Sequence, residues 1–341
     1  MEKRKIILIT GGAGFMGSNF VRFFLKSYPR CCVVNLDKLT YAGNRDNLKN
    51  VEQHPRYTFV KGDIVDSHLV SQLFLKYRFD TLFNFAAESH VDRSILGPRT
   101  FVQTDVLGVA TLLDAAREYG VRRFIQVSTD EVYGEIQRGL FSENTPFQPR
   151  SPYSASKAGG DLLTHAYYTT YNVPVIRIHS CNFYGPYQYP EKFIPLFITN
   201  FLEGKNAPLY STGEQVREWI YVDDFCRALN LVYQKGKAGE VYNIGTGHRF
   251  ANNVVAKIIA DSVGVPNTKI VQVKDRAGHD VRYALNTGKI RTLGFKPLVD
   301  FVSGLKETVT WYRNNRSWWM KIKKRKSFQE YYKRQYGEAL N

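Results

Sequence analysis

The sequence predicts an α/β protein with a doubly wound parallel sheet, and three observations predict it. Short apolar runs alternate with amphipathic stretches through the first half of the chain, which is the pattern of βαβ units. A glycine-rich turn, Gly11–Gly17, joins the first apolar run to the first amphipathic stretch. After about Phe183 the alternation stops, and three prolines interrupt a tyrosine-rich segment. This change predicts a smaller C-terminal domain, partly interleaved with the first.

The apolar runs and amphipathic stretches define the expected elements. The expected strands are Lys5–Thr10, Cys31–Leu36, Tyr57–Lys61, Thr81–Ala86, Phe124–Ser128 and Val173–His179. The expected helices include Phe15–Lys26, Arg99–Tyr119 and Tyr153–Tyr171. Six strands with intervening helices indicate a doubly wound sheet, in which ligands bind outside the carboxyl ends of the strands.

The composition excludes several classes of protein. The chain has 341 residues, of which 43% are hydrophobic and 23% charged, so it can bury a core. No run approaches the ~20 apolar residues of a membrane helix, and the start passes from charges into a strand without a signal-peptide pattern. The four cysteines show no metal-ligand spacing. We therefore expect a cytoplasmic protein with reduced thiols, no membrane partner and no metal.

The net charge of +16 is concentrated near the end of the chain. Nine basic residues and one acidic residue lie between Arg313 and Arg334, in a segment rich in Trp and Tyr. Such a run is either a solvated helical face or a patch that binds nucleic acid. The first interpretation is favoured because solvated helical faces are the commoner cause, so no nucleic acid partner is expected.

The glycine-rich turn predicts a dinucleotide site. Gly12, Gly14 and Gly17 match G-x-G-x-x-G, and Gly11, Gly14 and Gly17 match the variant G-x-x-G-x-x-G. Glycines allow a tight turn and a close approach of the backbone to a pyrophosphate, which then meets the free N–H groups of the following helix. The position between a strand and a helix supports this interpretation of a motif that is weak alone.

Two carboxylates follow later strands. Asp37 ends the second strand, 20 residues after Gly17, where a carboxylate accepts hydrogen bonds from a ribose and repels a 2′-phosphate. Asp37 therefore favours NAD over NADP, although Lys38 beside it leaves binding of NADP possible. The alternative role for Asp37 is only to cap a turn. Asp63 and Ile64 follow the third strand, where they suggest contacts with an adenine.

Two sets of polar residues indicate alcohol oxidation at the carboxyl ends of the strands. Tyr153 and Lys157 are four residues apart and share one helix face. A free phenol has a pKa of about 10, and a neighbouring ammonium favours the phenolate, which removes a proton from a hydroxyl. Thr129, Asp130 and Glu131 follow the fifth strand; their hydroxyl and carboxyl groups suit holding a sugar hydroxyl and dividing acid and base work. Helix capping is the alternative role for the two acids.

At this point the sequence resembles the dTDP-glucose 4,6-dehydratases of the extended short-chain dehydrogenase/reductase superfamily. The matching runs extend over nearly the whole chain: Asp37–Asn44, Ala86–Ser94, Thr129–Glu131, Tyr184–Tyr187, Pro190–Lys192, Arg217–Asp224, Gly278–Asp280 with Arg282-Tyr283, and the tryptophan pairs near Trp311 and Trp318. The match of the C-terminal run further weakens the nucleic-acid interpretation.

The resemblance implies an internal redox cycle on a nucleotide sugar. Tyr153, with Lys157 and Thr129, would remove the 4-hydroxyl proton as hydride passes from C4 to NAD. Glu131 would then remove the C5 proton and Asp130 would protonate the leaving 6-hydroxyl, before hydride returns to C6. The product is a 4-keto-6-deoxyglucose nucleotide, as in deoxysugar biosynthesis such as that of rhamnose.

The resemblance also implies two sets of contacts. Those expected for NAD are Gly11, Gly14, Phe15, Met16, Gly17, Asp37, Lys38, Leu39, Thr40, Asp63, Ile64, Ala86, Ala87, Ser89, Thr104, Tyr153 and Lys157. Those expected for the nucleotide sugar are Ser89, Thr129, Asn182, Lys192, Phe193, Pro208, Tyr210, Arg217, Asn252, His279 and Tyr283. Arg217 suits a diphosphate because a guanidinium forms bidentate hydrogen bonds; an ion pair with Glu218 or Asp223 is its alternative role.

Three positions depart from the family pattern. Phe183 stands where a second asparagine is expected, Asp105 stands where the family has asparagine after Thr104, and Ala277 replaces a proline. None changes the five expected catalytic residues, so the chemistry should survive. The choice between a thymine and a uracil nucleotide stays open.

The domain division follows the same resemblance. Residues 1–183 are expected to form a Rossmann-type NAD-binding domain to which parts of 218–245 return, and residues 184–341 a nucleotide-sugar-binding domain. A homodimer is expected through helices Arg99–Tyr119 and Tyr153–Tyr171.

Two other classes of function fit the sequence less well. A 4-epimerase shares the fold and the Tyr/Lys pair but needs no acid–base pair for C5 and O6, so Asp130 and Glu131 favour dehydration. A non-catalytic NAD-binding regulator or a nucleic-acid-binding protein would need none of the five catalytic side chains.

Overall fold

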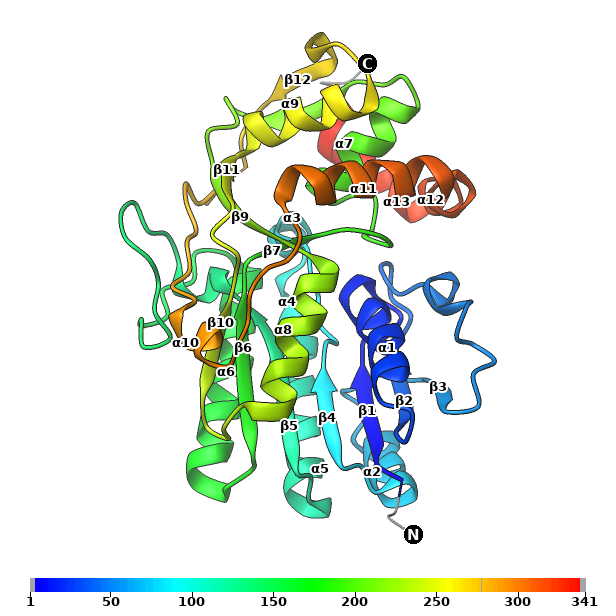
Figure 1. The fold of residues 1–341 in the computed structure, drawn as a ribbon, viewed down its shortest axis with the longest axis vertical. Helices are drawn as coiled ribbons and strands as arrows, with labels where there is room; N and C mark the ends of the chain where they lie inside the picture. The colour runs from blue at the N-terminus through cyan, green and yellow to red at the C-terminus, as the bar shows by residue number, and fades with distance from the viewer. Residues whose placement is uncertain (1–3, 277, 338–341) are drawn as a thin grey trace.

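A parallel sheet forms the lower half of the molecule in the orientation of Figure 1. The computed structural model describes residues 4–276 and 278–337. The seven strands lie in the order β10-β6-β5-β4-β1-β2-β3, and every neighbouring pair is parallel. Their bounds are β1 Ile6–Thr10, β2 Cys32–Asp37, β3 Tyr57–Lys61, β4 Thr81–Asn84, β5 Arg123–Thr129, β6 Val175–Ser180 and β10 Val241–Ile244. The order of the strands reverses beside β1, which confirms the predicted doubly wound fold.

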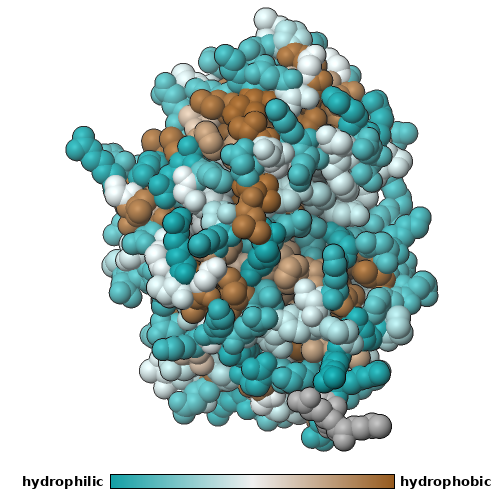
Figure 2. Space-filling model, viewed as in Figure 1, coloured by the Kyte–Doolittle hydropathy of each residue, from teal (hydrophilic) through white to brown (hydrophobic). Residues whose placement is uncertain are grey.

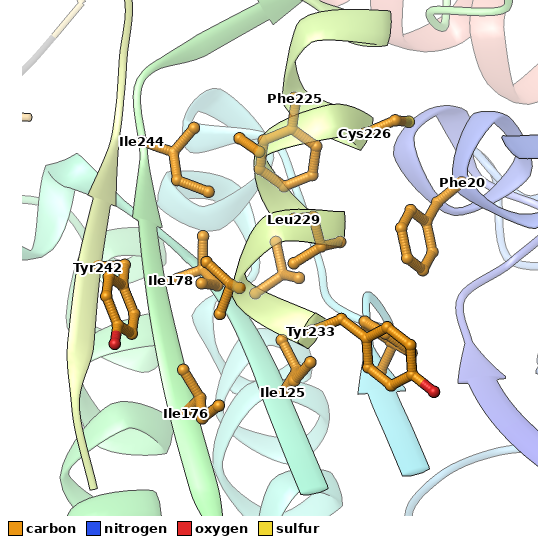
Figure 3. Close-up of a cluster of buried hydrophobic side chains, with 14 of the residues drawn as sticks. Phe20, Ile125, Ile176, Ile178, Phe225, Cys226, Leu229, Tyr233, Tyr242 and Ile244 are labelled. Carbon is orange, nitrogen blue, oxygen red and sulfur yellow. The ribbon is translucent and has the colours of Figure 1, made fainter. Parts of the chain in front are cut away.

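Helices cover both faces of the sheet. One face carries α1 (Phe15–Ser27) and α8 (Val222–Lys235); the other carries α2 (Ser67–Tyr77), α5 (Val109–Tyr119) and α6 (Pro152–Tyr171). Figure 3 shows Phe225 and Leu229 of α8 against the isoleucines of β5 and β6, with Phe20 of α1 beside them. Each such fully buried side chain contributes about 1.5–3 kcal/mol. This packing holds the sheet rigid beneath its carboxyl edge.

The sheet has one strand more than the six expected. β10 pairs with β6, and its four residues are all buried. A four-residue strand lying in the irregular second half, outside the βαβ rhythm, gives too weak a pattern to predict. A smaller difference is at β6, which starts at Val175 because Pro174 has no N–H to donate to the ladder.

The long helix expected over Arg99–Tyr119 is interrupted. The structure has α4 (Pro98–Val102), a π-helical turn η2 (Gln103–Gly108) and then α5. The turn η2 packs directly on α6, where a Cβ at Gly160 would lie 2.4 Å from the carbonyl oxygen of Asp105. The close approach of two backbones, which periodicity cannot show, accompanies the local change of helix type.

The upper part in Figure 1 is built from two small sheets and a group of helices. The sheets have the orders β11-β9-β7 and β12-β8. The strands are β7 Asn182–Tyr184, β8 Ala207–Tyr210, β9 Val216–Tyr221, β11 Arg249–Ala251 and β12 Ile270–Val273. The helices of this part are α7 Phe193–Leu202, α9 Asn252–Val263, α11 Phe301–Asn314, α12 Arg316–Lys323 and α13 Lys326–Tyr336. A second hydrophobic core, including Phe197 and Trp319, lies among them.

Short elements complete the described chain. They are the turns η1 Arg45–Leu48, η3 Asp130–Tyr133 and η4 Asn267–Lys269, and the helices α3 Val91–Leu96 and α10 Gly288–Thr292.

The basic C-terminal segment is helical and amphipathic. Trp319, Ile322 and Phe328 are buried, whereas Lys321, Lys326 and Lys333 of the same helices are exposed. One of those lysines, Lys321, pairs with Asp46 at 2.7 Å. The aromatic residues of the segment are therefore core residues. Figure 2 shows one face of the molecule, mostly hydrophilic, with its larger hydrophobic area in the upper half of the view. None of the helices in the described ranges has the length and apolarity needed to cross a membrane.

The glycine-rich turn depends on a residue without a side chain at Gly11. Its φ is +67°, and an added Cβ would lie 2.6 Å from the backbone nitrogen of Ala86. We predict that Gly11→Ala lowers the free energy of unfolding by about 3 kcal/mol, from left-handed strain plus overpacking. Gly264→Ala is the matched control, because φ is +86° but no atom lies within 4 Å of the added carbon; it should cost about 1 kcal/mol. Urea denaturation measures both, and equal losses would contradict the packing argument.

Candidate active site

A cleft opens between the carboxyl edge of the sheet and the upper part of the molecule. The ends of β1, β2, β4, β5 and β6 contribute to its floor, and α7, β8 and β9 contribute to its other wall. In an open α/β sheet this edge, next to the reversal of strand order, is where ligands bind. The residues predicted from different parts of the sequence are brought together here.

The first end of the cleft has the shape expected for a dinucleotide. Gly11, Gly14 and Gly17 line it, and a Cβ at Gly17 would lie 2.3 Å from the carbonyl oxygen of Gly11. The other predicted NAD contacts that line the cleft are Phe15, Met16, Asp37, Lys38, Thr40, Asp63, Ile64, Ala86, Ala87, Ser89, Thr104, Tyr153 and Lys157. The glycines leave a bare backbone cradle at the start of α1, which fits a pyrophosphate.

Asp37 caps the turn and also lines the cleft. Its carboxylate accepts hydrogen bonds from the N–H groups of Ala13 and Leu39, each at 2.8 Å, so it caps the turn. It also lines the cleft, and each carboxylate oxygen has a further lone pair for a ribose hydroxyl. Burial raises the pKa of this carboxyl, while the two N–H groups oppose that rise. Lys38 forms an ion pair with Asp63 at 2.6 Å.

The five expected catalytic residues all line the cleft. Thr129 ends β5 and accepts a hydrogen bond from the N–H of Glu131, and Tyr153 and Lys157 lie on the first turns of α6. The side chain of Ser151 caps this helix by accepting from the N–H of Ser154. The Lys157 ammonium donates to the Val127 carbonyl at 3.0 Å, which fixes the lysine beneath the end of β5.

The two adjacent carboxyls have different surroundings. Burial, and next the charge of Glu131, raise the pKa of Asp130 well above its usual value. Burial also raises the pKa of Glu131, but Arg276 and Arg217 favour its charged form. One oxygen of Asp130 is buried with no hydrogen-bond partner among the described residues. The arrangement favours a neutral acid beside an ionisable base.

Burial and the nearby carboxylates raise the pKa of the Tyr153 phenol well above its usual value. The phenol therefore needs positive charge nearby before it can act as a base.

The second end of the cleft is lined by the predicted sugar-nucleotide contacts Asn182, Lys192, Phe193, Pro208, Tyr210, Arg217, Asn252 and His279. The Arg217 guanidinium donates to the carbonyls of Val216 and Asp280 at 2.9 and 2.8 Å. Neither alternative acid pairs with it: Glu218 forms its ion pair with Arg249, and within the described ranges Asp223 forms none. A fixed, buried guanidinium that faces the cleft suits an anion.

Two predicted contacts do not line the cleft. Leu39 is in the left-handed region with φ of 57° and packs against the core of the sheet. Tyr283 is buried behind Arg217, with its ring 4.4 Å from the guanidinium carbon, and its hydroxyl donates to Asp280. Both were placed by sequence matching, which identifies a segment but does not show which side chains of it face the ligand.

Several cleft residues were not predicted, among them Glu88, His90, Asp92, Glu191 and Arg276. Two of them form an ion pair: Asp92 accepts from Arg276 at 3.0 Å, and it also accepts from the Tyr210 hydroxyl at 2.9 Å. Their position in the sequence could have identified them. Four of the five lie within the runs that carried the resemblance, and Arg276 lies two residues before such a run.

The three positions that depart from the family pattern lie in different parts of the chain. Phe183 lines the cleft and packs on Phe225, with ring centroids 4.7 Å apart. Asp105 is fully buried behind Lys157 and hydrogen-bonds to Ser156, closer to the catalytic helix than its sequence position suggested. Ala277 lies outside the described residues. No group of three or more His, Cys, Asp or Glu side chains with a metal-binding arrangement occurs in 4–276 and 278–337.

Comparison with known proteins decides the family. The model of the GDP-mannose 4,6 dehydratase family matches residues 8–308. The dTDP-glucose 4,6-dehydratase of Streptomyces antibioticus is 48% identical over 94% of this chain and 96% of its own length. The chain belongs to the dTDP-glucose 4,6-dehydratase family.

Three further proteins are similar to this dehydratase family member. The low-salt glycan biosynthesis protein Agl12 of Haloferax volcanii is 51% identical over 90% of this chain and 98% of its own length. The solved structure of DesIV, a dTDP-glucose 4,6-dehydratase from Streptomyces venezuelae with NAD bound, has a TM-score of 0.91 at 51% identity and covers 93% of this chain and 99% of that one. A UDP-glucose 4-epimerase of Thermotoga maritima has a TM-score of 0.85 at 30% identity, covering 91% of this chain and 99% of that one.

An arginine clamp joins the two walls of the cleft in this dehydratase family member. Arg93 donates to both carboxylate oxygens of Glu191, from Nε to Oε1 at 3.3 Å and from Nη2 to Oε2 at 2.7 Å. Its guanidinium carbon lies 4.0 Å from the Tyr41 ring centroid and 4.3 Å from that of Tyr331. Glu191 is buried, and the paired Arg93 offsets the free-energy cost of burying its charge.

We predict that Arg93→Lys lowers the free energy of unfolding by about 2–3 kcal/mol, because lysine forms neither the two parallel bonds nor the stack. Arg122→Lys is the matched control. Arg122 pairs with Asp80 and lies near the Tyr233 ring, but it is exposed, so its loss should stay below about 0.5 kcal/mol. Urea denaturation compares the two, and similar losses would contradict the role of the buried clamp.

Proposed function

We propose that this protein converts dTDP-glucose to dTDP-4-keto-6-deoxyglucose with NAD as a resident cofactor. The observation that carries the proposal is the presence of Asp130 and Glu131 in one cleft with Tyr153 and Lys157. Oxidation alone needs only the tyrosine and lysine, whereas elimination of water also needs an acid and a base. Relatives 46–48% identical to this chain carry the name dTDP-glucose 4,6-dehydratase.

The residues at the first end of the cleft fit NAD. The bare glycine backbone at the start of α1 would hold the pyrophosphate, and Asp37 would hold a ribose. When bound, NAD supplies a hydride acceptor that takes hydride from C4 and returns it to C6. Because the cofactor ends in its starting state, a cleft that retains it serves the reaction.

Tyr153 starts the cycle by taking the proton of the sugar 4-hydroxyl. Lys157 supplies the nearby positive charge that favours the phenolate, since its ammonium is held in place by Val127. Thr129 orients the sugar hydroxyl. The 4-keto group then acidifies the hydrogen at C5.

Elimination follows at C5 and C6. Glu131 removes the C5 proton. The electron pair of the C5–H bond then forms the C5–C6 double bond as the C6–O bond breaks. Asp130, kept neutral by burial, protonates the leaving hydroxyl, so that water departs. Arg217 holds the diphosphate and thereby positions the hexose.

We also propose the wider organisation. Residues 1–183, with parts of 218–245, act as the cofactor domain, and residues 184–341 as the sugar-nucleotide domain. The protein works as a homodimer in the cytoplasm. Exposed apolar side chains on the packed elements α4, η2 and α6 support the dimer: Val102, Leu107 and Leu162 are each more than half exposed.

We predict that dTDP-glucose carrying deuterium at C4 yields product with the label at C6, and that no net NADH accumulates. The hydride that leaves C4 is the one returned to C6, so solvent has no part in the transfer. Mass spectrometry of the product measures the label. The same labelled sugar on UDP tests the base in parallel. Label lost to solvent or kept at C4 would exclude the mechanism.

We predict that Glu131→Gln lowers the exchange of the C5 proton with solvent at least about 100-fold while NAD affinity changes less than twofold. The amide cannot accept the proton, but it keeps the shape of the side chain. Exchange is followed by NMR in heavy water and NAD affinity by titration. Glu330→Gln is the control, since Glu330 is exposed on α13 and pairs only with Lys326 among the described residues. Equal collapse of cofactor binding would make Glu131 a structural residue.

A further inference from the structure

A buried carboxyl lies behind the catalytic helix without any role in the proposed chemistry. Asp105 is on the π-helical turn η2 and only 1% exposed. Its two oxygens have different partners: one accepts from the Ser156 hydroxyl at 2.7 Å, and the other accepts from the N–H of Glu88 at 3.2 Å. Asp105 therefore connects α6, which carries Tyr153 and Lys157, to the loop after β4 that lines the cleft.

The turn η2, which carries the buried Asp105, packs closely against α6. A Cβ at Gly160 would lie 2.4 Å from the Asp105 carbonyl oxygen, and one at Gly159 would lie 3.0 Å from Val106. The backbones of η2 and α6 are thus in direct contact. A charge held in such a site acts on its neighbours through protein and not through solvent, so its field is weakly screened.

The charged groups around Asp105 come from each element packed against it. Lys157 and Asp161 belong to α6, and Glu88 belongs to the loop after β4. Of these, only the Lys157 ammonium favours the ionised form of Asp105. Tyr153, on the same helix, is disfavoured as phenolate by the charge of Asp105, as it is by Glu131 and Asp130.

We propose that Asp105 is a positioning residue for the catalytic helix, and that its ionisation governs how readily the Tyr153 phenol gives up its proton. The proposal rests on the proposed function in assigning Tyr153 as the base. Ionised Asp105 offsets part of the positive charge of Lys157 and so weakens the support that this ammonium gives to the phenolate. When Asp105 is neutral, the Lys157 ammonium stabilises the Tyr153 phenolate in full.

The ionisation falls in a useful pH range. Burial, opposed by Lys157 and Ser156, raises the pKa of Asp105 to about 6. Burial and the charge of Asp105 raise the pKa of Glu88 to about 7. Asp105 is therefore neutral at pH 5 and charged at pH 7.5. As the pH falls, it takes up a proton and makes the phenolate easier to form, which counteracts the protonation of Tyr153 itself.

The test is the pH dependence of the first hydride transfer in the NAD-bound enzyme of Asp105→Asn. Single-turnover formation of NADH from dTDP-glucose is followed in both proteins, and the isotope effect of the C4-deuterated sugar confirms that this step is measured. Removing one charge several Å away should shift the part of the profile above about pH 6 to lower pH by about one unit. We expect the variant to be up to about tenfold faster near pH 7 and equal to the unaltered enzyme at pH 5.

A second readout needs no sugar. The phenolate absorbance that is lost in Tyr153→Phe reports the same proton in the NAD-bound protein. In the Asp105→Asn background this absorbance should appear at lower pH by a similar amount. The absorbance therefore tests Asp105 even if dTDP-glucose is not the substrate, in which case the unaltered enzyme forms no NADH while the phenolate shift is still measured.

Ser156→Ala is the matched control, because it removes a hydrogen bond to Asp105 but keeps the charge. The lost bond had lowered the pKa of Asp105, so Asp105 in Ser156→Ala should stay neutral to a higher pH. The pH below which the rate of Ser156→Ala equals that of Asp105→Asn should therefore rise above 6. Asp105→Ser serves as a second uncharged variant if the asparagine does not fold. Three results would each overturn the proposal. They are a rate of Asp105→Asn that is lowered at every pH, identical effects of Ser156→Ala and Asp105→Asn, and a phenolate titration that Asp105→Asn does not move.

Discussion

The structure depends on the parallel register of β1, β4, β5 and β6 at their carboxyl ends. That register places Thr10 opposite Asn84 and Thr129 opposite Ser180. A row of side chains holds it across the sheet: Thr10 donates to Asn84, and Asn84 donates to Gln126 at 2.8 Å. All three are buried and hydrogen-bonded, which is the condition for polar groups in a core. A slip of one residue would turn Thr129 away from the cleft.

Buried acids lie in and behind the cleft above this edge. Asp130 lines the cleft and Asp105 lies behind it, and burial raises the pKa of each. Arginines and a lysine lie near them, so the carboxyl groups of the site differ in how readily they ionise. Asp92, held by Arg276 and Tyr210, fixes the far wall in the same way. Such a site holds a sugar among groups whose proton affinities differ, which suits a reaction that moves several protons.

Much of the site was predictable because its residues follow strands or begin helices. The turn at Gly11, the carboxylate at Asp37 and the pair Tyr153/Lys157 each carry a spacing with a physical reason, and all line the cleft. Tyr283 and Leu39 do not line the cleft, since spacing does not give the direction of a side chain in an irregular segment. The strand β10 and the turn η2 were missed because their patterns are short and their causes lie in distant parts of the chain.

The sequence by itself determined the fold class, the glycine-rich turn and the residue types of the proposed acid–base set, because local spacing controls backbone conformation and residue type controls chemistry. Only the tertiary structure decided which charges face one another. No spacing in the sequence links Asp105 to Tyr153, yet Asp105 lies behind the helix that carries Tyr153 and Lys157, because the backbone of η2 comes into contact with the glycines of α6. Electrostatic coupling depends on distance and burial, and those quantities exist only once the chain is packed.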